Sequence, residues 1–164
     1  EAVKLAQRYG ADEQKAYVAG LLHDAAKGKC QFGLKKYAGR YGIEVDDIEA
    51  SNVELIHGKL GAAMVKEQLG IEDEDILSAI RWHTTGRANM SLLEKIIYLA
   101  DLIEPGRRFE GIDSIRKIAY QDLNKAMLEA LKQVMSFVQS KGFALHPNSL
   151  EAYNDFKKEE KSLF

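Results

Sequence analysis

The sequence contains little cysteine or proline and no long hydrophobic run. Its single cysteine, Cys30, excludes an internal disulfide and any zinc site built from several thiolates. No apolar segment approaches the roughly 18 residues of a membrane-spanning helix, and no signal peptide is visible. We therefore expect a cytoplasmic protein, in a reducing compartment, that has no membrane partner.

An excess of charge of one sign is also missing. The chain has 23 lysines and arginines against 25 aspartates and glutamates, which gives a net charge of −2. This balance argues against a protein that coats nucleic acid or anionic membranes, and the absence of a basic helix disfavours a DNA-binding helix-turn-helix. Any basic patch for a phosphate ligand must therefore be local.

Helical periodicity is present throughout the 164 residues, and no convincing two-residue alternation indicates a strand. The length suits one domain with a sizeable core. We predict an all-α fold, a single compact helical bundle over residues 1–164 without an internal repeat or linker. The predicted helices are Glu1–Tyr9, Asp12 to about Lys27, Cys30–Tyr41, Asp46–Ser51, Glu54–Leu69, Asp73–His83, Ser91 to about Ile103, Asp113–Tyr120, Asp122–Lys141 and a last helix capped by Ser149.

Two of these helices carry strong local signals. Ser91 and Glu94 have the spacing of a capping box, which predicts a helix start at Ser91. The helix over 122–141 has one continuous apolar stripe, which we expect to face the core. The stripe consists of Leu123, Ala126, Met127, Ala130, Leu131, Val134, Phe137 and Val138.

Three histidines and two aspartates are predicted to point inward from four separate helices. They are His23, Asp24, His57, His83 and Asp101. A buried ionised carboxylate costs several kcal/mol unless it is paired or bound to a metal. One inward-facing histidine is usually just a hydrogen-bonded core residue, but five such polar groups together favour a metal site. A cluster of ion pairs without metal is the alternative.

The donor types restrict the metal. Imidazole and carboxylate without thiolate suit iron, manganese, zinc or magnesium, and fit copper or structural zinc poorly. Five ligands exceed what one catalytic metal needs if positions stay open for water. Two ions bridged by a carboxylate would use them all, and a pair about 3.5–4 Å apart is common in enzymes that hydrolyse phosphate esters and anhydrides.

Candidate phosphate-binding side chains follow the predicted ligands closely in the sequence. They are Lys27, Thr84, Thr85, Arg87 and Arg107. Lys27 comes one predicted helical turn after His23, and the others come shortly after His83 or Asp101. Arginine suits bidentate binding of phosphate oxygens. A lone lysine or arginine is commonly a solvated surface charge, but grouping beside three ligand positions favours phosphate binding.

The ordered series of His23-Asp24, His57, His83 and Asp101 resembles the metal-binding residues of the HD superfamily. The additional histidines are similar to those of its two-metal members. Three segments are also similar to the bacterial YqeK family: His-Gly-Lys-Leu-Gly-Ala at 57–62, Ala-Ile-Arg-Trp-His-Thr-Thr-Gly-Arg at 79–87 and Tyr-Leu-Ala-Asp-Leu-Ile-Glu-Pro-Gly-Arg at 98–107. Proteins of that family are iron-dependent symmetrical diadenosine tetraphosphate hydrolases. The resemblance covers nearly the whole chain.

The resemblance implies central cleavage of diadenosine tetraphosphate to two ADP by a metal-bound hydroxide, without a protein nucleophile. It implies two divalent ions, iron first and manganese or another ion as alternatives, bridged by Asp24. His23 and Asp101 would bind one ion with a further histidine, while His57 and His83 would complete the site of the other.

The resemblance also implies roles in catalysis and substrate binding. Asp24 and Lys27 would be catalytic, and Lys27 and Arg107 would hold phosphates. The segment 141–147 is similar to the family's nucleotide-contacting C-terminal segment, so His146 would touch base or ribose. A hydrogen bond at a helix end is the alternative for His146.

One feature departs from the family pattern, which begins with a metal-binding histidine on the first helix. No histidine precedes His23. We expect the first helix to be truncated at the start of this numbering, so that the chain as written binds at least one metal weakly.

Several functions remain open at this point. Another nucleotide phosphohydrolase with the HD ligands, such as a 5′-nucleotidase or a phosphodiesterase, would use the same residues. A non-catalytic nucleotide-binding HD module or a purely structural helical protein are further alternatives. The expected partner is a small-molecule dinucleoside polyphosphate or nucleotide rather than nucleic acid, and a homodimer is left open.

Overall fold

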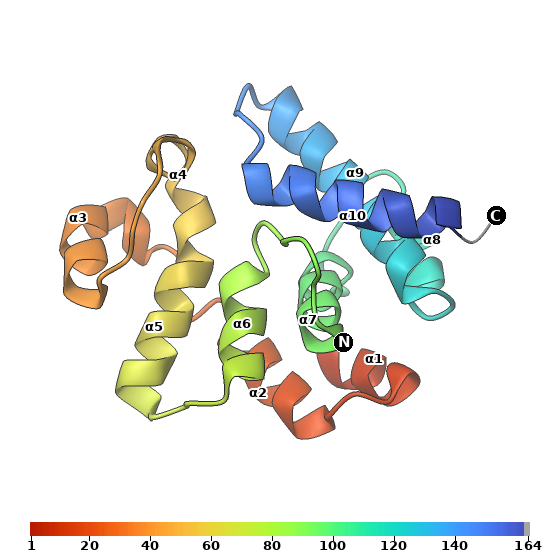
Figure 1. Ribbon diagram of the computed structural model, residues 1–164, viewed down its shortest axis with the longest axis horizontal. Coiled ribbons are helices and arrows are strands. Elements are labelled where there is room, and N and C mark those ends of the chain that lie inside the picture. Colours follow the sequence, from red (N-terminus) through yellow and green to blue (C-terminus); the bar gives the residue numbers. More distant parts are fainter. Residues whose placement is uncertain (163–164) are drawn as a thin grey trace.

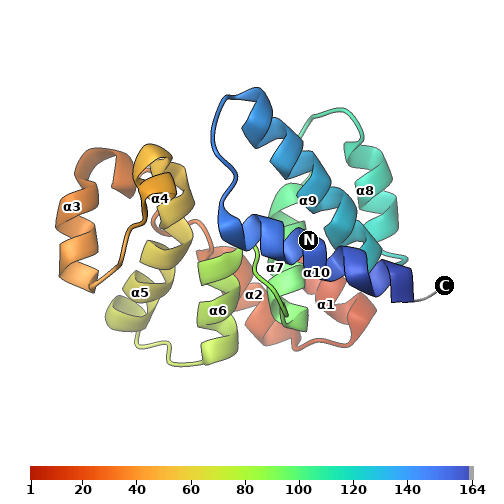
Figure 2. The same ribbon diagram turned by 45° about the horizontal axis from the view of Figure 1, so that its top comes forward.

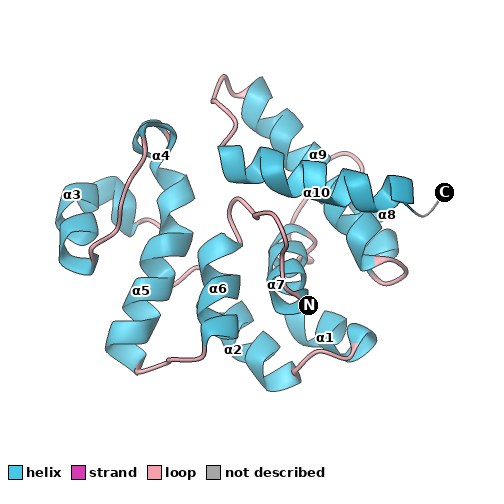
Figure 3. Ribbon diagram, viewed as in Figure 1, coloured by secondary structure: helices cyan, strands magenta, loops and turns pink. Residues whose placement is uncertain are grey.

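The computed structural model describes residues 1–162, including all side chains except those of residues 30–32, 34, 35 and 162. The side chain of Cys30 therefore lies outside the described residues. Residues 1–162 form helices and loops without a strand, which confirms the all-α prediction (Figure 3). None of these helices combines the length and apolar character needed to cross a lipid bilayer. The elements are α1 (Ala2–Tyr9), α2 (Glu13–Leu22), α3 (Lys29–Tyr41), α4 (Asp47–Ser51), the 3₁₀ helix η1 (Val53–Ile56), α5 (His57–Leu69), α6 (Glu74–Trp82), α7 (Leu92–Leu102), α8 (Ile112–Ala119), α9 (Leu123–Ser140) and α10 (Pro147–Ser162).

Side-chain caps explain why several helices begin where the sequence predicts. A side-chain oxygen accepts a hydrogen bond from a free backbone N–H in the first turn, which stabilises the helix start. The capping residues are Asp12, Asp46, Asp73, Ser91 and Asp122. Ser91 also forms the predicted capping box, because Glu94 accepts a hydrogen bond from the Ser91 amide. These helix starts therefore follow from local sequence.

The predicted helix from Asp12 to Lys27 is too long. Helix α2 ends at Leu22, and residues 23–28 form successive turns in which the Lys27 amide donates to the Asp24 carbonyl. Such turns wind the chain more tightly than an α-helix does. Ala26 is fully buried in the small hydrophobic cluster beside α5, which stabilises the altered path. Contrary to the prediction from the sequence, Lys27 is therefore not one α-helical turn beyond His23.

Two other helix starts also differ from the prediction. The helix expected from Glu54 is split into η1 and α5, so that His57 stands at the junction. The last helix begins at Pro147 rather than being capped by Ser149. Proline suits the first position of a helix because the amide hydrogen it lacks would have no partner inside the helix.

Helices α6 and α7 lie in the middle of the molecule. Helix α6 contacts α2, α5 and α7, while α7 contacts α1, α2, α6 and α9. Figures 1 and 2 place α3, α4 and α5 on one side of this pair and α8, α9 and α10 on the other. The larger hydrophobic core joins α1, α2 and α5–α10, and a smaller cluster lies between α3, η1 and α5. Helix α5 contributes side chains to both.

Helices α5 and α6 approach each other closely at Gly58. A Cβ atom at Gly58 would lie 2.6 Å from the carbonyl oxygen of Arg81 and 3.1 Å from that of Ile80. Real Cβ atoms do not approach a backbone oxygen so closely, so any larger residue would force the two helices apart. This contact lies next to His57 in the sequence and two to three residues before His83, which directly follows the facing helix.

We predict that Gly58→Ala destabilises the fold by about 1–3 kcal/mol, because the added methyl group overpacks a backbone contact. Urea denaturation followed by circular dichroism measures this difference. Gly39→Ala in α3 is the matched control, since a Cβ there meets no heavy atom within 4 Å. Alanine is the better helix former, so the control is expected to be unchanged or about 0.5–1 kcal/mol more stable. Equal stability of the two variants would contradict the close packing at Gly58.

Candidate metal centre

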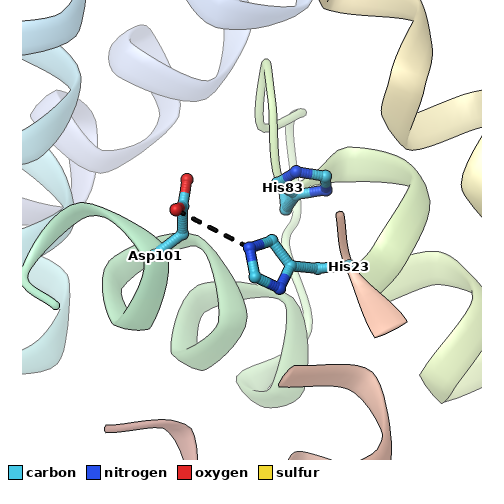
Figure 4. Close-up of side chains that lie close together, drawn as sticks. All are labelled: His23, His83 and Asp101. Atoms are coloured by element: carbon cyan, nitrogen blue, oxygen red, sulfur yellow. Dashed lines mark ion pairs between the residues drawn. The ribbon is translucent and has the colours of Figure 1, made fainter. Parts of the chain in front are cut away.

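Four helix ends bring the five predicted ligands together. His23 directly follows α2, His57 is the first residue of α5, His83 directly follows α6, and Asp101 lies in the last turn of α7. Asp24 is adjacent to His23. The side chains of His23, His83 and Asp101 are drawn close together in Figure 4. Packing of the helices thus gathers residues that are far apart in the sequence.

The ligand atoms form two overlapping groups. His23, His83 and Asp101 form one group, and Asp24, His57 and His83 form the other, with the ligand atoms of each within 4.8 Å of one another. Asp24 Oδ1 lies 3.1 Å from His57 Nε2 and 3.6 Å from His83 Nε2. His23 Nε2 lies 3.6 Å from both Asp101 Oδ1 and Asp24 Oδ2.

The three imidazole rings are held to the backbone in the same way. In each ring Nδ1 lies within hydrogen-bond distance of the backbone carbonyl three residues earlier. The carbonyls that face His23, His57 and His83 belong to Gly20, Glu54 and Ile80. A carbonyl oxygen accepts hydrogen bonds and cannot donate, so Nδ1 carries the proton of a neutral ring. The Nε2 lone pair of each ring is then free to bind a metal.

Without a cation this arrangement is unfavourable. Asp24 Oδ1 is buried and has no hydrogen-bond partner among the described residues. Burial, the largest effect, lowers the pKa of His57, which keeps that ring neutral at neutral pH. The lone pair of His57 Nε2 therefore faces a carboxylate oxygen, and it also lies 2.9 Å from His83 Nε2. A bound cation would turn each of these repulsions into an attraction.

The spacing fits metal coordination. Ligand atoms about 2.1 Å from one ion lie about 3 Å apart when their bonds meet at a right angle. The separations of His57 Nε2 from His83 Nε2 and from Asp24 Oδ1, 2.9 and 3.1 Å, match this value. The nitrogen and oxygen donors suit a first-row divalent ion or magnesium. This cluster could hold a divalent metal, as the sequence predicts.

Two cationic side chains flank the cluster. Lys27 Nζ lies 2.7 Å from Asp24 Oδ2, and an Arg107 guanidinium nitrogen lies 2.7 Å from Asp101 Oδ1. Burial would raise the pKa of Asp101, but His23 and Arg107 outweigh it and lower the pKa to about 2. Burial lowers the pKa of His23, and the carboxylates of Asp101 and Asp24 more than offset that effect, so that the pKa is raised. The carboxylates thus remain ionised and available to a metal at neutral pH.

A cavity of about 470 Å³ opens onto this cluster. One part of its wall is ionic and contains ligands together with Lys27 and Arg107. Another part is apolar and aromatic, and comes largely from the C-terminal half of α9. The lining residues are Lys27, Glu54, Leu55, His57, His83, Thr84, Tyr98, Asp101, Leu102, Arg107, Arg108, Phe109, Gln133, Val134, Phe137 and Val138. Such a cavity suits a ligand that joins an anionic group to a flat apolar one.

Two of the predicted phosphate-binding residues lie outside this cavity wall. Thr85 is 4% exposed, and its hydroxyl donates to the Gly86 carbonyl. Arg87 forms a salt bridge at 3.0 Å with Glu94, whose side chain is fully buried. Both residues therefore support the loop between α6 and α7 in this structure. Thr84, by contrast, lines the cavity and donates to the Leu55 carbonyl.

His146 is also apart from the cluster. Its Nδ1 accepts a hydrogen bond from the Asn148 amide in the first turn of α10, and its Nε2 lies 3.0 Å from Asp46 Oδ2. Since Nδ1 is an acceptor, Nε2 carries the proton of the neutral ring and donates to Asp46. This is the opposite tautomer to the one inferred for the metal-facing histidines. The helix-end hydrogen bond is present, while contact of His146 with a substrate stays a prediction.

The predictions from the sequence did not include the part of the cavity wall that α9 contributes. Its apolar stripe does face the core as far as Leu131, but the same prediction is wrong for Val134, Phe137 and Val138, which are at least partly exposed and line the cavity. Helix α9 continues beyond the part of its length that neighbouring helices cover. Gln133, which interrupts the apolar character of this segment, was the signal available in the sequence.

We predict that a divalent ion such as Mn²⁺ raises the thermal midpoint of the full-length protein, because binding to the folded state alone stabilises it. Asp24→Asn should lose most of this rise, because it removes the charge of a candidate metal ligand. The variant should still fold, because the Asp24 side chain is partly exposed and asparagine has nearly the same shape. Differential scanning calorimetry with and without Mn²⁺, together with bound-metal analysis, measures the effect. Asp113→Asn, which removes an 84% exposed carboxylate, is the control and should respond as wild type. Full metal binding by Asp24→Asn would contradict the site.

Known proteins resemble this chain in sequence and in structure. The HD domain family model matches residues 2–106. A protein named symmetrical bis(5′-nucleosyl)-tetraphosphatase from Halalkalibacterium halodurans is 46% identical over 98% of this chain and 85% of its own length. The protein of the same name from Bacillus subtilis is 43% identical over 93% of this chain and 82% of its own length.

A crystal structure from Clostridium acetobutylicum, named as a predicted HD superfamily hydrolase involved in NAD metabolism, also matches. It is 48% identical, has a TM-score of 0.91, and the match covers 96% of this chain and 84% of that one. The matched family residues include all five side chains gathered at the candidate metal centre. Taken with the geometry of that centre, these similarities show that the chain belongs to the HD domain family.

Proposed function

We propose that the protein is a metal-dependent symmetrical bis(5′-nucleosyl)-tetraphosphatase that hydrolyses diadenosine tetraphosphate to two molecules of ADP. The observation that carries this proposal is the single cavity in which His57, His83 and Asp101 lie beside the cations Lys27 and Arg107. The names of the two tetraphosphatase relatives, at 46% and 43% identity over most of their length, support the same substrate.

The proposed cofactor is a pair of divalent ions, with iron the first candidate and manganese the second. Asp24 is suited to bridge them, because its two oxygens face different histidines: Oδ1 lies 3.1 Å from His57 Nε2, and Oδ2 lies 3.6 Å from His23 Nε2. His83 belongs to both ligand groups and stands between the two positions. When bound, such a pair lowers the pKa of water and neutralises charge on a phosphoryl group.

Lys27 and Arg107 are proposed to bind the phosphates. Each now pairs with a ligand carboxylate at 2.7 Å, yet their side chains are 49% and 41% exposed. Once metal neutralises Asp24 and Asp101, the two cations can turn to the oxygens of the tetraphosphate. Their positive charge then stabilises the charge that develops on the leaving ADP. The Thr84 hydroxyl lines the same cavity and can donate to a phosphate oxygen.

Other predictions extend this proposal. Thr85, Arg87 and His146 would contact substrate only after giving up the hydrogen bonds and ion pairs described above. We further propose that residues 1–164 act as a single domain on a small-molecule dinucleotide.

The decisive experiment supplies diadenosine tetraphosphate to the full-length protein, loaded with Fe²⁺ in the absence of oxygen, in ¹⁸O-labelled water. ADP alone is expected, with one ¹⁸O atom in the β-phosphate of half of the ADP molecules, because water attacks one of the two central phosphorus atoms. ATP together with AMP would show asymmetric cleavage and contradict the proposal. Bound metal without turnover would indicate a different nucleotide substrate.

Arg107→Ala is expected to lower kcat/KM for diadenosine tetraphosphate about 10- to 100-fold, because a charge-assisted hydrogen bond contributes roughly 1.5–3 kcal/mol. Steady-state kinetics at fixed metal concentration measure the effect. Arg40→Ala is the matched control, since Arg40 forms an exposed ion pair with Glu67 on the far side of α5 from the core helices. Similar losses in both variants would contradict phosphate binding by Arg107.

A further inference from the structure

The apolar end of the cavity contains a side chain that structural packing does not explain. Leu55, Val134, Phe137 and Val138 line this end, and Phe137 is 58% exposed even though it belongs to the cavity wall. The ammonium of Lys141 lies 5.5 Å from the centre of the Phe137 ring, while no stable packing buries the ring. An accessible aromatic ring among apolar side chains suits stacking with a flat heterocycle, which contributes to nucleotide binding in many proteins.

Gln133 lies one helical turn before Phe137 and lines the same cavity. Side chains four residues apart on a helix occupy the same face, so a ring placed against Phe137 has its edge near the Gln133 amide. Gln133 is partly buried and forms no hydrogen bond with any described residue. The other polar groups of the wall named above, on Lys27, Thr84 and Arg107, all have partners.

We propose that Gln133 is the specificity-determining residue that binds the Watson–Crick edge of the nucleobase, and that its amide lets the site take both adenine and guanine. This inference rests on the proposed function for the nature of the substrate. An amide offers a donor beside an acceptor. Adenine presents the N6 amino donor beside the N1 acceptor, and guanine presents the O6 acceptor beside the N1–H donor. Rotating the amide by half a turn satisfies either base, so purine dinucleoside tetraphosphates of both kinds are substrates.

Gln133→Glu tests this assignment because it replaces the donor with a second acceptor. Guanine offers two adjacent donors, N1–H and the N2 amino group, which a carboxylate accepts together. Adenine would place its N1 lone pair against the carboxylate. The ratio of kcat/KM for diguanosine tetraphosphate to that for diadenosine tetraphosphate is expected to rise about tenfold over wild type, the scale of one bidentate base contact. The ratio cancels the repulsion that the added charge exerts on phosphates of both substrates.

Two control variants separate base recognition from other effects. Gln139→Glu adds the same charge to the exposed side of the same helix, outside the cavity wall, and should leave the ratio unchanged. Gln133→Leu keeps the apolar volume and removes both hydrogen bonds, so it should lower kcat/KM for the two substrates alike. If the substrate ratio of Gln133→Glu equals that of Gln139→Glu, the inference about Gln133 is overturned. Turnover of diadenosine tetraphosphate by the wild-type protein would in that case still support the proposed hydrolase activity.

Binding measurements keep the inference testable if the proposed activity fails. Isothermal titration calorimetry of ADP and of GDP with the metal-loaded, full-length protein needs no turnover. The affinity for GDP relative to ADP should rise about tenfold in Gln133→Glu, on the same basis as the kinetic ratio. An unchanged relative affinity, or no binding of either nucleotide to wild type, would overturn the assignment of Gln133.

Discussion

The orientation of three imidazole rings governs the chemistry of this protein. Each ring is fixed by a hydrogen bond from Nδ1 to the carbonyl three residues earlier, so its Nε2 lone pair points toward Asp24 or Asp101. Asp24 Oδ1 is buried, has no hydrogen-bond partner among the described residues and faces the lone pair of His57 Nε2, so these two atoms repel each other. A divalent cation removes the conflict, and Lys27 and Arg107 offset part of the carboxylate charge in its absence.

The helices reinforce the preference for a cation. Helices α2, α6 and α7 all end at the cluster, and the C-terminal end of a helix carries partial negative charge from its unpaired carbonyls. The same three ends are held in place by the main hydrophobic core. The close contact at Gly58 then brings α5 against α6, which sets the 2.9 Å separation between His57 Nε2 and His83 Nε2. Packing of the backbone directly beside His57 and His83 therefore determines how closely these two ligands approach each other.

The cavity has a charged part and an apolar part in its wall. Side chains from the ends of α5, α6 and α7 make one part charged, whereas the exposed half of α9 makes another part apolar. This division matches a nucleotide, whose phosphates need cations and whose base needs a flat apolar surface with a few hydrogen bonds. Helix α9 serves both the core and the cavity, because its stripe is covered by neighbouring helices as far as Leu131 and remains accessible beyond that residue.

Local sequence was enough to predict most of the helices and to select the five side chains that gather at the candidate metal centre. Periodicity and caps are local, so helix starts such as Ser91 could be predicted, and inward-facing histidines and aspartates on several helices indicated a metal site. Only the tertiary structure decided which partners these side chains find. The turns at 23–28, the pairing of Arg87 with Glu94, the capping role of His146 and the exposed half of α9 all depend on neighbours distant in the sequence. A local pattern specifies which face of a helix is buried, but the packing of whole helices sets the distances between their side chains.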